Sequence, residues 1–283
     1  MMQANTKKLL GRVPMAWPTL LVSGATIAVW LGASALALAG VLPLWLAALL
    51  NGLAAFFAFT PMHDASHKSV SNQPWVNELV GHASGVLLAA PFAAFRMLHL
   101  THHRHTNEPG LDPDFWSGEG SRWSLPLRWL TQDLHYYHHY FQRWATRPKA
   151  ERRAVIAQLC LLYGAALALS FAGFGLQVVV LWLLPARIAL AFLAWGFDYL
   201  PHRPHQVPAR VDRFAATRIL ADRWLTPLFL YQNYHLIHHL YPAVPFYRYG
   251  QVWRAKRAEL LHKGARVEHL IPRPAPQPQA ATT

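Results

Sequence analysis

Four stretches of the chain are almost continuously apolar, and each approaches or exceeds the about 20 residues that a helix needs to cross a bilayer. They are Pro18–Ala39, Leu42–Pro61, Ala154–Phe171 and Gly175–Phe197. The links within the first pair and within the second pair are very short and carry no lysine or arginine. The pattern therefore predicts an all-α integral membrane protein with four transmembrane helices in two hairpins.

A further apolar stretch, Gly81–Met97, is interrupted by Pro91, which is unfavourable inside a helix. A re-entrant or interfacial helix fits this stretch better than a fifth span, because an extra crossing would place the histidines on its two sides on opposite faces of the membrane. Residues 104–153 interleave tryptophan with arginine, as helices at the headgroup level do. We expect residues 1–270 to form one domain and residues 271–283, rich in proline, glutamine and alanine, to be a disordered tail.

The composition agrees with a membrane protein, since 53% of the residues are apolar and 14% are charged. Most of the net charge of +13 lies outside the short links, so the positive-inside rule places both termini and the central segment in the cytoplasm, with the chain in the inner membrane. The basic residues form no nucleic-acid-binding motif, and nucleic acid is not an expected partner. The sole cysteine, Cys160, excludes a disulfide framework. We interpret the N-terminal apolar run as an uncleaved anchor.

Histidines stand in short clusters with spacings that suit a helix. Three of these clusters are His63-x3-His67, His99-x2-His102-His103 and His235-x2-His238-His239, and a fourth, Asp198-x3-His202, follows the last apolar stretch. Residues three and four apart share a helix face, so each cluster directs its imidazoles toward one point. In the predicted topology all four clusters lie at the cytoplasmic mouth of the bundle. Neutral imidazole is a good ligand for iron, zinc or copper.

These clusters predict a metal centre with nine histidine ligands, which are His63, His67, His99, His102, His103, His202, His235, His238 and His239. The zinc-protease motif His-Glu-x2-His is absent, and nine imidazoles exceed what one tetrahedral zinc ion can bind, so two metal ions are implied. Further side chains are candidates to orient the ligand imidazoles or to reach a metal through water, and these are Asp64, Asp112, Asp114, Asp198 and Asn233.

One more cluster, His135-x2-His138-His139, has the same spacing but lies in an aromatic segment far from the end of any apolar stretch. We interpret it as the polar face of an interfacial helix. His105 and His205 are close enough in sequence to predicted ligands to be outer groups of the site. Arg187, the one clear charge within an apolar stretch, has no assigned role.

The motifs His-Asp-Ala-Ser-His at 63–67, His-Leu-Thr-His-His at 99–103 and Asn-Tyr-His-Leu-Ile-His-His at 233–239 resemble those of the integral-membrane fatty acid desaturase superfamily. The resemblance implies two iron ions held by histidines on the cytoplasmic side of a four-span bundle, with O2 as co-substrate and two electrons per reaction. It also implies a ligand at the end of the fourth span, where His202 lies, with Asp198 in place of a more usual asparagine.

Residues 197–204 and 232–242 are similar to the cyanobacterial-type β-carotene hydroxylase branch, and the likeness spans about residues 55–250. This branch implies hydroxylation of a carotenoid β-ring at its 3-position. A fatty acyl desaturase or acyl hydroxylase is the alternative, because the metal ligands are the same for both. Electrons would come from a separate donor, such as an acidic ferredoxin that binds the basic cytoplasmic face. A metal transporter is a more distant alternative, because transporters place ligands near mid-membrane and these stretches contain no histidine.

Overall fold

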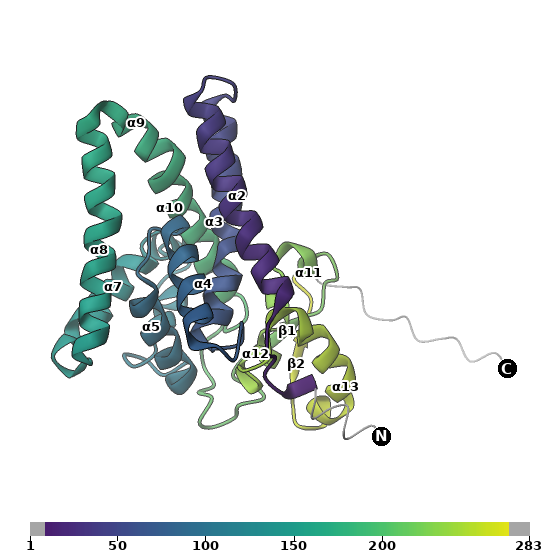
Figure 1. Cartoon of the computed structure of the whole chain (residues 1–283). Helices are drawn as coiled ribbons and strands as arrows, with labels where there is room; N and C mark the ends of the chain where they lie inside the picture. Colours follow the sequence, from purple (N-terminus) through teal and green to yellow (C-terminus); the bar gives the residue numbers. More distant parts are fainter. Residues whose placement is uncertain (1–8, 272–283) are drawn as a thin grey trace.

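The computed structural model describes residues 9–271 of the chain, which are mainly helical (Figure 1). The longer helices are α2 (Trp17–Leu38), α3 (Leu44–Ser66), α4 (Pro74–Leu87), α5 (Phe92–His105), α7 (Gln132–Gln142), α8 (Lys149–Leu169), α10 (Leu184–Leu193) and α13 (Tyr249–His262). The shorter ones are α6 (Leu125–Leu130), α9 (Gly175–Val178), α11 (Leu225–Leu228) and α12 (His235–Leu240). Helical turns are η1 (Pro113–Gly118), η2 (Trp144–Thr146), η3 (Ser170–Phe174), η4 (Val179–Leu183), η5 (Ala194–Tyr199), η6 (Gln232–Tyr234) and η7 (Phe246–Arg248), and the strands are β1 (Arg218–Leu220) and β2 (Arg266–Glu268). The predicted tail begins at Ile271, and its residues 272–283 lie outside the described part of the chain.

Within residues 9–271, three helices are long and apolar enough to cross a membrane. Two are α2 and α3, which form the first predicted hairpin. The third is a helical run of 51 residues, Lys149–Tyr199, which contains both predicted stretches of the second hairpin. It reverses at Gly173, where a φ of 95° lies in the left-handed region that glycine adopts readily. As a result α8 ascends to the α9 turn and α10 descends from it (Figure 1).

Helix α3 ends at Ser66 and not at Pro61, where the apolar pattern predicted its end. Pro61 removes one backbone donor from the helix, but the residues that follow it in α3 are buried. The Ser66 hydroxyl also donates to the carbonyl of His63 at 2.7 Å, and the Ser69 hydroxyl donates to the carbonyl of Asp64 at 3.0 Å. Packing and these hydrogen bonds outweigh the lost backbone bond. His63 therefore lies inside the helix.

The predicted break at Pro91 is confirmed. Helices α4 and α5 meet at an angle of 102° across the short segment before Phe92, as a broken span or a re-entrant loop would. The two helices pack closely at this elbow, because a Cβ atom on Gly81 would lie 2.3 Å from the ring of Phe92. The elbow fixes the direction of α5, which carries three of the predicted ligands.

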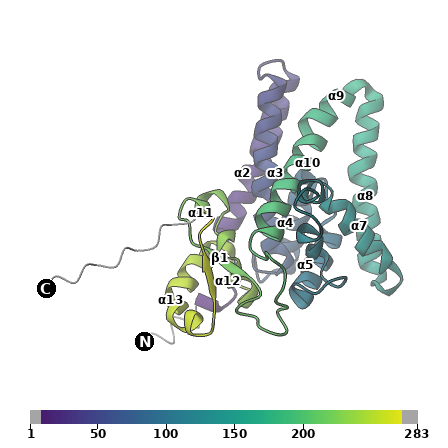
Figure 2. The ribbon, with the colours of Figure 1, turned by 180° about the vertical axis from the view of Figure 1, so that it is seen from behind.

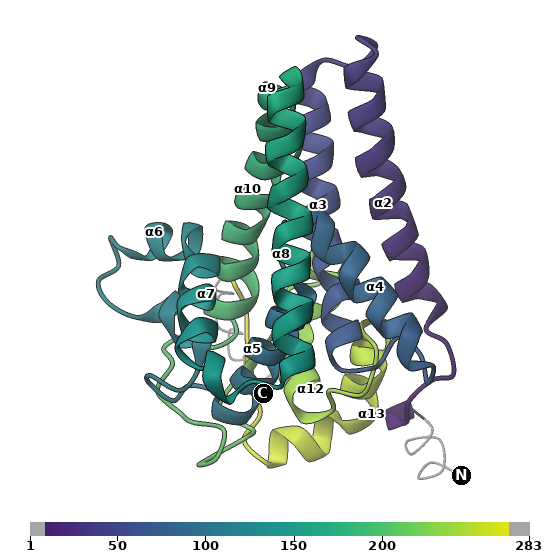
Figure 3. The same ribbon diagram turned by 60° about the vertical axis from the view of Figure 1, so that its left-hand side comes forward.

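Helices α12 and α13 form a cap at the end of the molecule opposite the α9 turn (Figures 2 and 3). Strands β1 and β2 pair in parallel, with Ile219 opposite Val267. The all-α prediction is wrong in this detail, because two three-residue strands so far apart in sequence carry no local signal of their pairing. Buried Leu236 and Ile237 pack α12 into an apolar cluster that includes Tyr249 of α13.

Candidate metal centre

All nine histidines that were predicted as ligands lie together where α3, α5, α12 and the segment after η5 meet. Their ring nitrogens form two main groups, each within 4.8 Å. The first group is His63, His67, His99 and His238, and the second is His102, His202, His235 and His239. Each group has the residue types and spacing to hold a metal ion.

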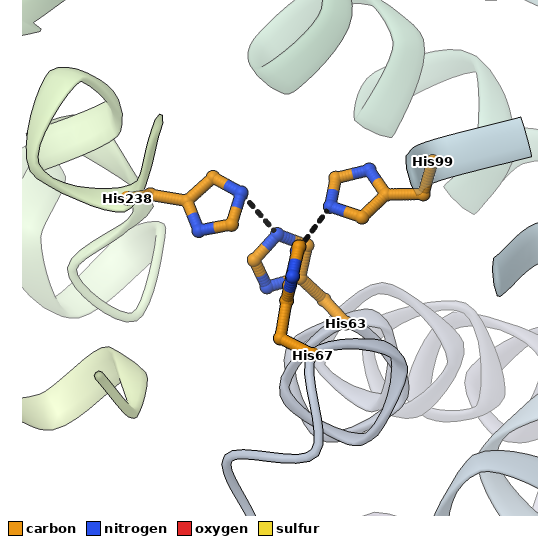
Figure 4. Close-up of side chains that lie close together, drawn as sticks. All are labelled: His63, His67, His99 and His238. Carbon is orange, nitrogen blue, oxygen red and sulfur yellow. Dashed lines mark hydrogen bonds between the residues drawn. The ribbon is translucent and has the colours of Figure 1, made fainter. Parts of the chain in front are cut away.

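The first group joins three helices through buried imidazoles. His63 lies in α3 and His67 directly follows its last residue, and they face His238 of α12 and His99 of α5 (Figure 4). The Nε2 atoms of His63 and His238 are 3.0 Å apart, and those of His67 and His99 are 2.8 Å apart. The same ring nitrogen of each histidine therefore points to a common centre.

In the second group, the Nε2 atom of His235 lies 2.9 Å from that of His202 and 3.0 Å from that of His239. The Nε2 atoms of His239 and His102 are 3.2 Å apart. His103 connects the groups, because it forms a further potential metal-binding set with His238 of the first group and His239 of the second. Its Nε2 atom lies 2.7 Å from that of His238. The two groups are thus immediate neighbours.

Each of the two triple clusters contributes to both groups, which the sequence did not predict. On α5, His99 joins the first group and His102 the second. On α12, His238 joins the first group, while His235 and His239 join the second. Residues three and four positions after a given one lie about 60° and 40° to either side of it around a helix. One cluster therefore has enough angular spread to serve two adjacent centres.

Burial favours the neutral form of the four predicted ligands that follow the second hairpin. It lowers the pKa of His202, His235, His238 and His239 well below the usual histidine value, and neighbouring imidazoles lower it further. A neutral imidazole carries one N–H and one lone pair. Where Nδ1 holds the hydrogen, several Nε2 lone pairs face one another, which is unfavourable without a cation between them.

The distances between the Nε2 atoms also fit a metal centre. They run from 2.7 Å to 3.2 Å. Metal–nitrogen bonds of about 2.1 Å at right angles place two ligand nitrogens about 3 Å apart, as along an octahedral edge. The donors therefore fit two adjacent ions with several imidazole ligands each.

Carboxylates orient one of these imidazoles. His102 Nδ1 donates to Asp112 at 2.8 Å and lies 3.3 Å from Asp114, which leaves its Nε2 lone pair directed at the second group. Tyr136 of α7 donates to Asp114 at 2.6 Å, and its hydroxyl lies 3.3 Å from Asp198. Asp112, Asp114 and Asp198 are thus part of one buried network beside His102.

Asp64 and Asn233 have different contacts. Asp64 accepts a hydrogen bond from the Thr19 hydroxyl at 2.9 Å, and its other oxygen lies 4.0 Å from Nδ1 of His63, so it connects α2 to the centre. Asn233 donates to the carbonyl of Leu220 at 2.9 Å and to the Thr226 hydroxyl at 3.2 Å. These contacts hold the segment that leads into α12, and the role of Asn233 beside the ligands stays a prediction.

Three polar residues of the site were not predicted. The Tyr249 hydroxyl lies 3.0 Å from Nδ1 of His238, Gln232 lies 3.5 Å from Nδ1 of His63, and Tyr136 joins the carboxylate network described above. Tyr249 and Gln232 reach their histidines only through the tertiary fold. For Tyr136 the sequence offered one signal, its place in the aromatic segment around His135.

The His135 cluster does not join the nine histidines. In α7, His135 stacks on Trp116 with ring centroids 4.6 Å apart, and His138 lies 2.8 Å from Gln142. Equal spacing did not distinguish this cluster from the others, because spacing does not determine which way a helix faces.

Arg187 forms an ion pair with Asp133 and so connects α10 to α7.

Of the two histidines expected as outer groups, His205 lies beside the centre, with its ring centroid 6.1 Å from that of His202. His205 packs on Tyr199 and approaches Gly118 so closely that a Cβ atom there would lie 2.3 Å from its ring. His105 Nδ1 lies 3.8 Å from a carboxylate oxygen of Glu108. Neither residue belongs to a potential metal-binding group in the described part of the chain.

An apolar cavity between α5, α7 and α10 adjoins the histidines. It is lined by apolar side chains such as Ala94, Leu98 and Leu193. Four residues also line the small pocket at the histidine centre, and these are Phe59, Phe95, Tyr136 and Asp198. The cavity therefore leads from the helices of the bundle to the centre.

A second apolar groove, of about 400 Å³, lies between α3 and α10. Gly52, Phe56, Pro185 and Phe192 are among its lining residues. Phe197 separates it from the histidines, because its ring lies 5.9 Å from Phe56 of the groove and also lines the central pocket.

Comparison with known proteins agrees with this geometry. The family model for fatty acid desaturases matches residues 39–270. The sn-1 oleoyl-lipid 12-desaturase of Synechocystis sp. is 29% identical over 254 residues, which cover 79% of this chain and 72% of that protein. A beta-carotene ketolase of Paracoccus sp. is 30% identical over 250 residues, which cover 84% of this chain and 93% of that protein.

A chloroplastic sn-2 acyl-lipid omega-3 desaturase (ferredoxin) of Helianthus annuus is 26% identical over 257 residues, which cover 78% of this chain and 56% of that protein. The resemblance seen in the histidine motifs is confirmed by the family match, which extends over most of the chain. The chain belongs to the fatty acid desaturase family of membrane oxidoreductases.

Proposed function

We propose that this protein is a di-iron membrane oxygenase that uses O2 and two electrons to oxidise a lipid-soluble substrate. The observation that carries the proposal is the pair of adjacent, buried imidazole groups, each with four nitrogens of one kind facing a common centre. We assign all nine clustered histidines as ligands. When bound there, iron supplies the activation of O2 that attack on an unactivated C–H bond requires.

In this proposal the other residues of the site act on the ligands and on the substrate. Asp112 holds the Nδ1 hydrogen of His102, and Tyr249 plays the corresponding part for His238. The cavity beside α10 would bind the apolar substrate and exclude water, with Tyr136 and Asp198 at its inner end.

For the substrate we propose a carotenoid β-ring, hydroxylated at its 3-position. The support is the Paracoccus beta-carotene ketolase, which this chain matches over almost that protein's whole length, together with the resemblance of residues 197–204 and 232–242. The second candidate is an acyl chain, as in a desaturase, and the similarity to the Synechocystis 12-desaturase favours it.

We also propose that the protein has four spans in two hairpins in the inner membrane, with the metal centre on the cytoplasmic side. The basic residues outside the short links support this orientation. Electrons would come from a separate donor, and the Helianthus relative is a desaturase whose name specifies ferredoxin.

The test is product analysis in bacterial cells that accumulate β-carotene and express this chain, with membrane fatty acids profiled from the same cells. We expect 3-hydroxylated carotenoids, and we expect His238→Ala to abolish both the product and the bound iron while the protein remains in the membrane. New unsaturated acyl chains with unchanged carotene would establish the second candidate. A purified protein with its nine histidines intact that binds no iron would refute the di-iron proposal.

A further inference from the structure

In the described part of the chain, a hollow of about 270 Å³ opens on the cap where predicted ligands come nearest to the surface. Seven of the nine histidines are buried, whereas His103 and His239 are half-buried. These two line the hollow, together with Arg104, Arg210, Arg213 and Leu240. The metal centre is therefore nearest to solvent at this hollow.

The charged residues that line the hollow are all basic. Arg104, Arg210 and Arg213 are exposed. Arg210 pairs with Glu108 at 3.2 Å, and Asp212 accepts from the backbone N–H of Phe214 at 2.8 Å, so the excess positive charge of the hollow rests on Arg104 and Arg213. The hollow thus presents a positive surface directly over two imidazoles.

Two lysines border this surface, Lys256 of α13 and Lys263, which directly follows that helix. Lys263 lies over the ring of Phe214 at 5.5 Å, Lys256 lies over the ring of Tyr241 at 5.8 Å, and both pair with Glu259, so the three side chains together add one positive charge. Clustered charge of one sign accelerates and orients the encounter with a partner of the opposite sign. This surface fits an acidic protein.

We propose that the hollow is the docking surface for an acidic one-electron carrier of the ferredoxin class, with electrons entering through the edges of His103 and His239. The proposal rests on the proposed function, because only a redox centre needs such a partner. Electron transfer slows steeply with distance, so the carrier must approach an exposed part of the ligand shell. The groove between α3 and α10 does not fit this partner, because it is apolar and lies in the spanning part of the chain.

The stoichiometry balances for hydroxylation. Two reduced carriers each lose one electron, and these two electrons, two protons and one O2 convert one C–H group to C–OH and release one water. The carrier therefore has to bind and leave twice in each turnover, which favours a docking surface made of exposed charges over a large apolar one.

The proposal is tested by titrating oxidised plant-type [2Fe–2S] ferredoxin onto the purified, iron-loaded full-length protein at low and at high salt. We expect the double variant R104E/R213E to weaken binding at low salt by about tenfold or more. The matched control is R122E/R153E, which makes the same charge change on exposed arginines of the loop before α6 and of α8, outside both the hollow and α13. We expect this control to change the affinity by less than about threefold.

A second measurement separates docking from catalysis. With dithionite and methyl viologen as electron source, R104E/R213E should retain the iron content and the turnover of the unchanged protein. Equal weakening by both double variants, or no weakening by either, would overturn the proposal. So would loss of turnover with the chemical reductant, because the arginines would then serve the metal centre itself. Because binding is measured without substrate, its outcome is independent of whether the proposed substrate is correct.

Discussion

Two imidazoles of the histidine centre are held through Nδ1 by different side chains, His102 by Asp112 and His238 by Tyr249. We predict that Tyr249→Phe weakens metal binding by about tenfold, because the buried Nδ1–H of His238 loses its acceptor while the ring packing is kept. Competition with a chelator measures this affinity. Tyr247→Phe is the control, since Tyr247 lies two residues before Tyr249 and has no hydrogen bond to a predicted ligand among the described residues. Equal losses of metal affinity in both variants would contradict the assignment.

Tyr136 connects Asp114 to Asp198 where the apolar cavity meets the histidine centre. We predict that Tyr136→Phe lowers turnover per bound iron by about tenfold, because Asp114 loses a hydrogen bond and His102 is held less firmly. The iron content should stay near that of the unchanged protein. Tyr137→Phe is the matched control, because Tyr137 lines the same cavity but is not bonded to either aspartate. Unchanged turnover in Tyr136→Phe would exclude this positioning role.

At this scale the sequence predicted the histidines better than their partners. The spacing within His99–His103 and His235–His239 is local, so a helix alone is enough to bring those imidazoles together. Tyr249 and Gln232 contact their histidines only after distant segments have packed. The repeat of the same spacing at His135–His139 shows the limit of the local rule, because it does not determine which face of the helix meets the centre.

Among the elements, the elbow between α4 and α5 determines where three of the histidines lie. We predict that Gly81→Ala destabilises the protein by about 1–3 kcal/mol and lowers its iron content, because a Cβ atom would lie 2.3 Å from the buried ring of Phe92 and push α5 away. Thermal unfolding and metal analysis of the purified protein measure both effects. In the control Gly24→Ala no atom lies within 4 Å of the added methyl, so stability should be unchanged or slightly higher.

The apolar pattern located the long helices well and their ends less well. It placed the end of α3 at Pro61, but helix ends depend on burial and on capping hydrogen bonds such as that from Ser66 to His63, which hydropathy does not report. The break at Pro91 was predictable because proline acts through its own backbone. The pairing of β1 with β2 was not, because it depends on where residues 221–265 return the chain.

For the whole molecule, the proposed topology places the α2–α3 turn and the α9 turn in the periplasm and the hollow in the cytoplasm. We predict that an impermeant maleimide labels Val41→Cys and Phe171→Cys in intact cells with a permeabilised outer membrane, and labels Val211→Cys only after lysis. These side chains are 70%, 90% and 68% exposed, so protein packing does not hide them. Cys160→Ser provides the background. Labelling of Val211→Cys in intact cells would reverse the orientation.

The histidine centre is also the point at which α3, α5, α12 and the end of the second hairpin are joined. Without a cation, several buried Nε2 lone pairs face one another at about 3 Å, so metal binding should stabilise the folded state strongly. We predict that removing the metal with a chelator lowers the unfolding temperature by roughly 5 °C or more, and that adding iron back restores it. His238→Ala should already unfold at the lower temperature and respond little to the chelator. An unfolding temperature that does not depend on metal would mean that packing alone holds these segments together, and that the imidazoles are tolerated without a cation between them.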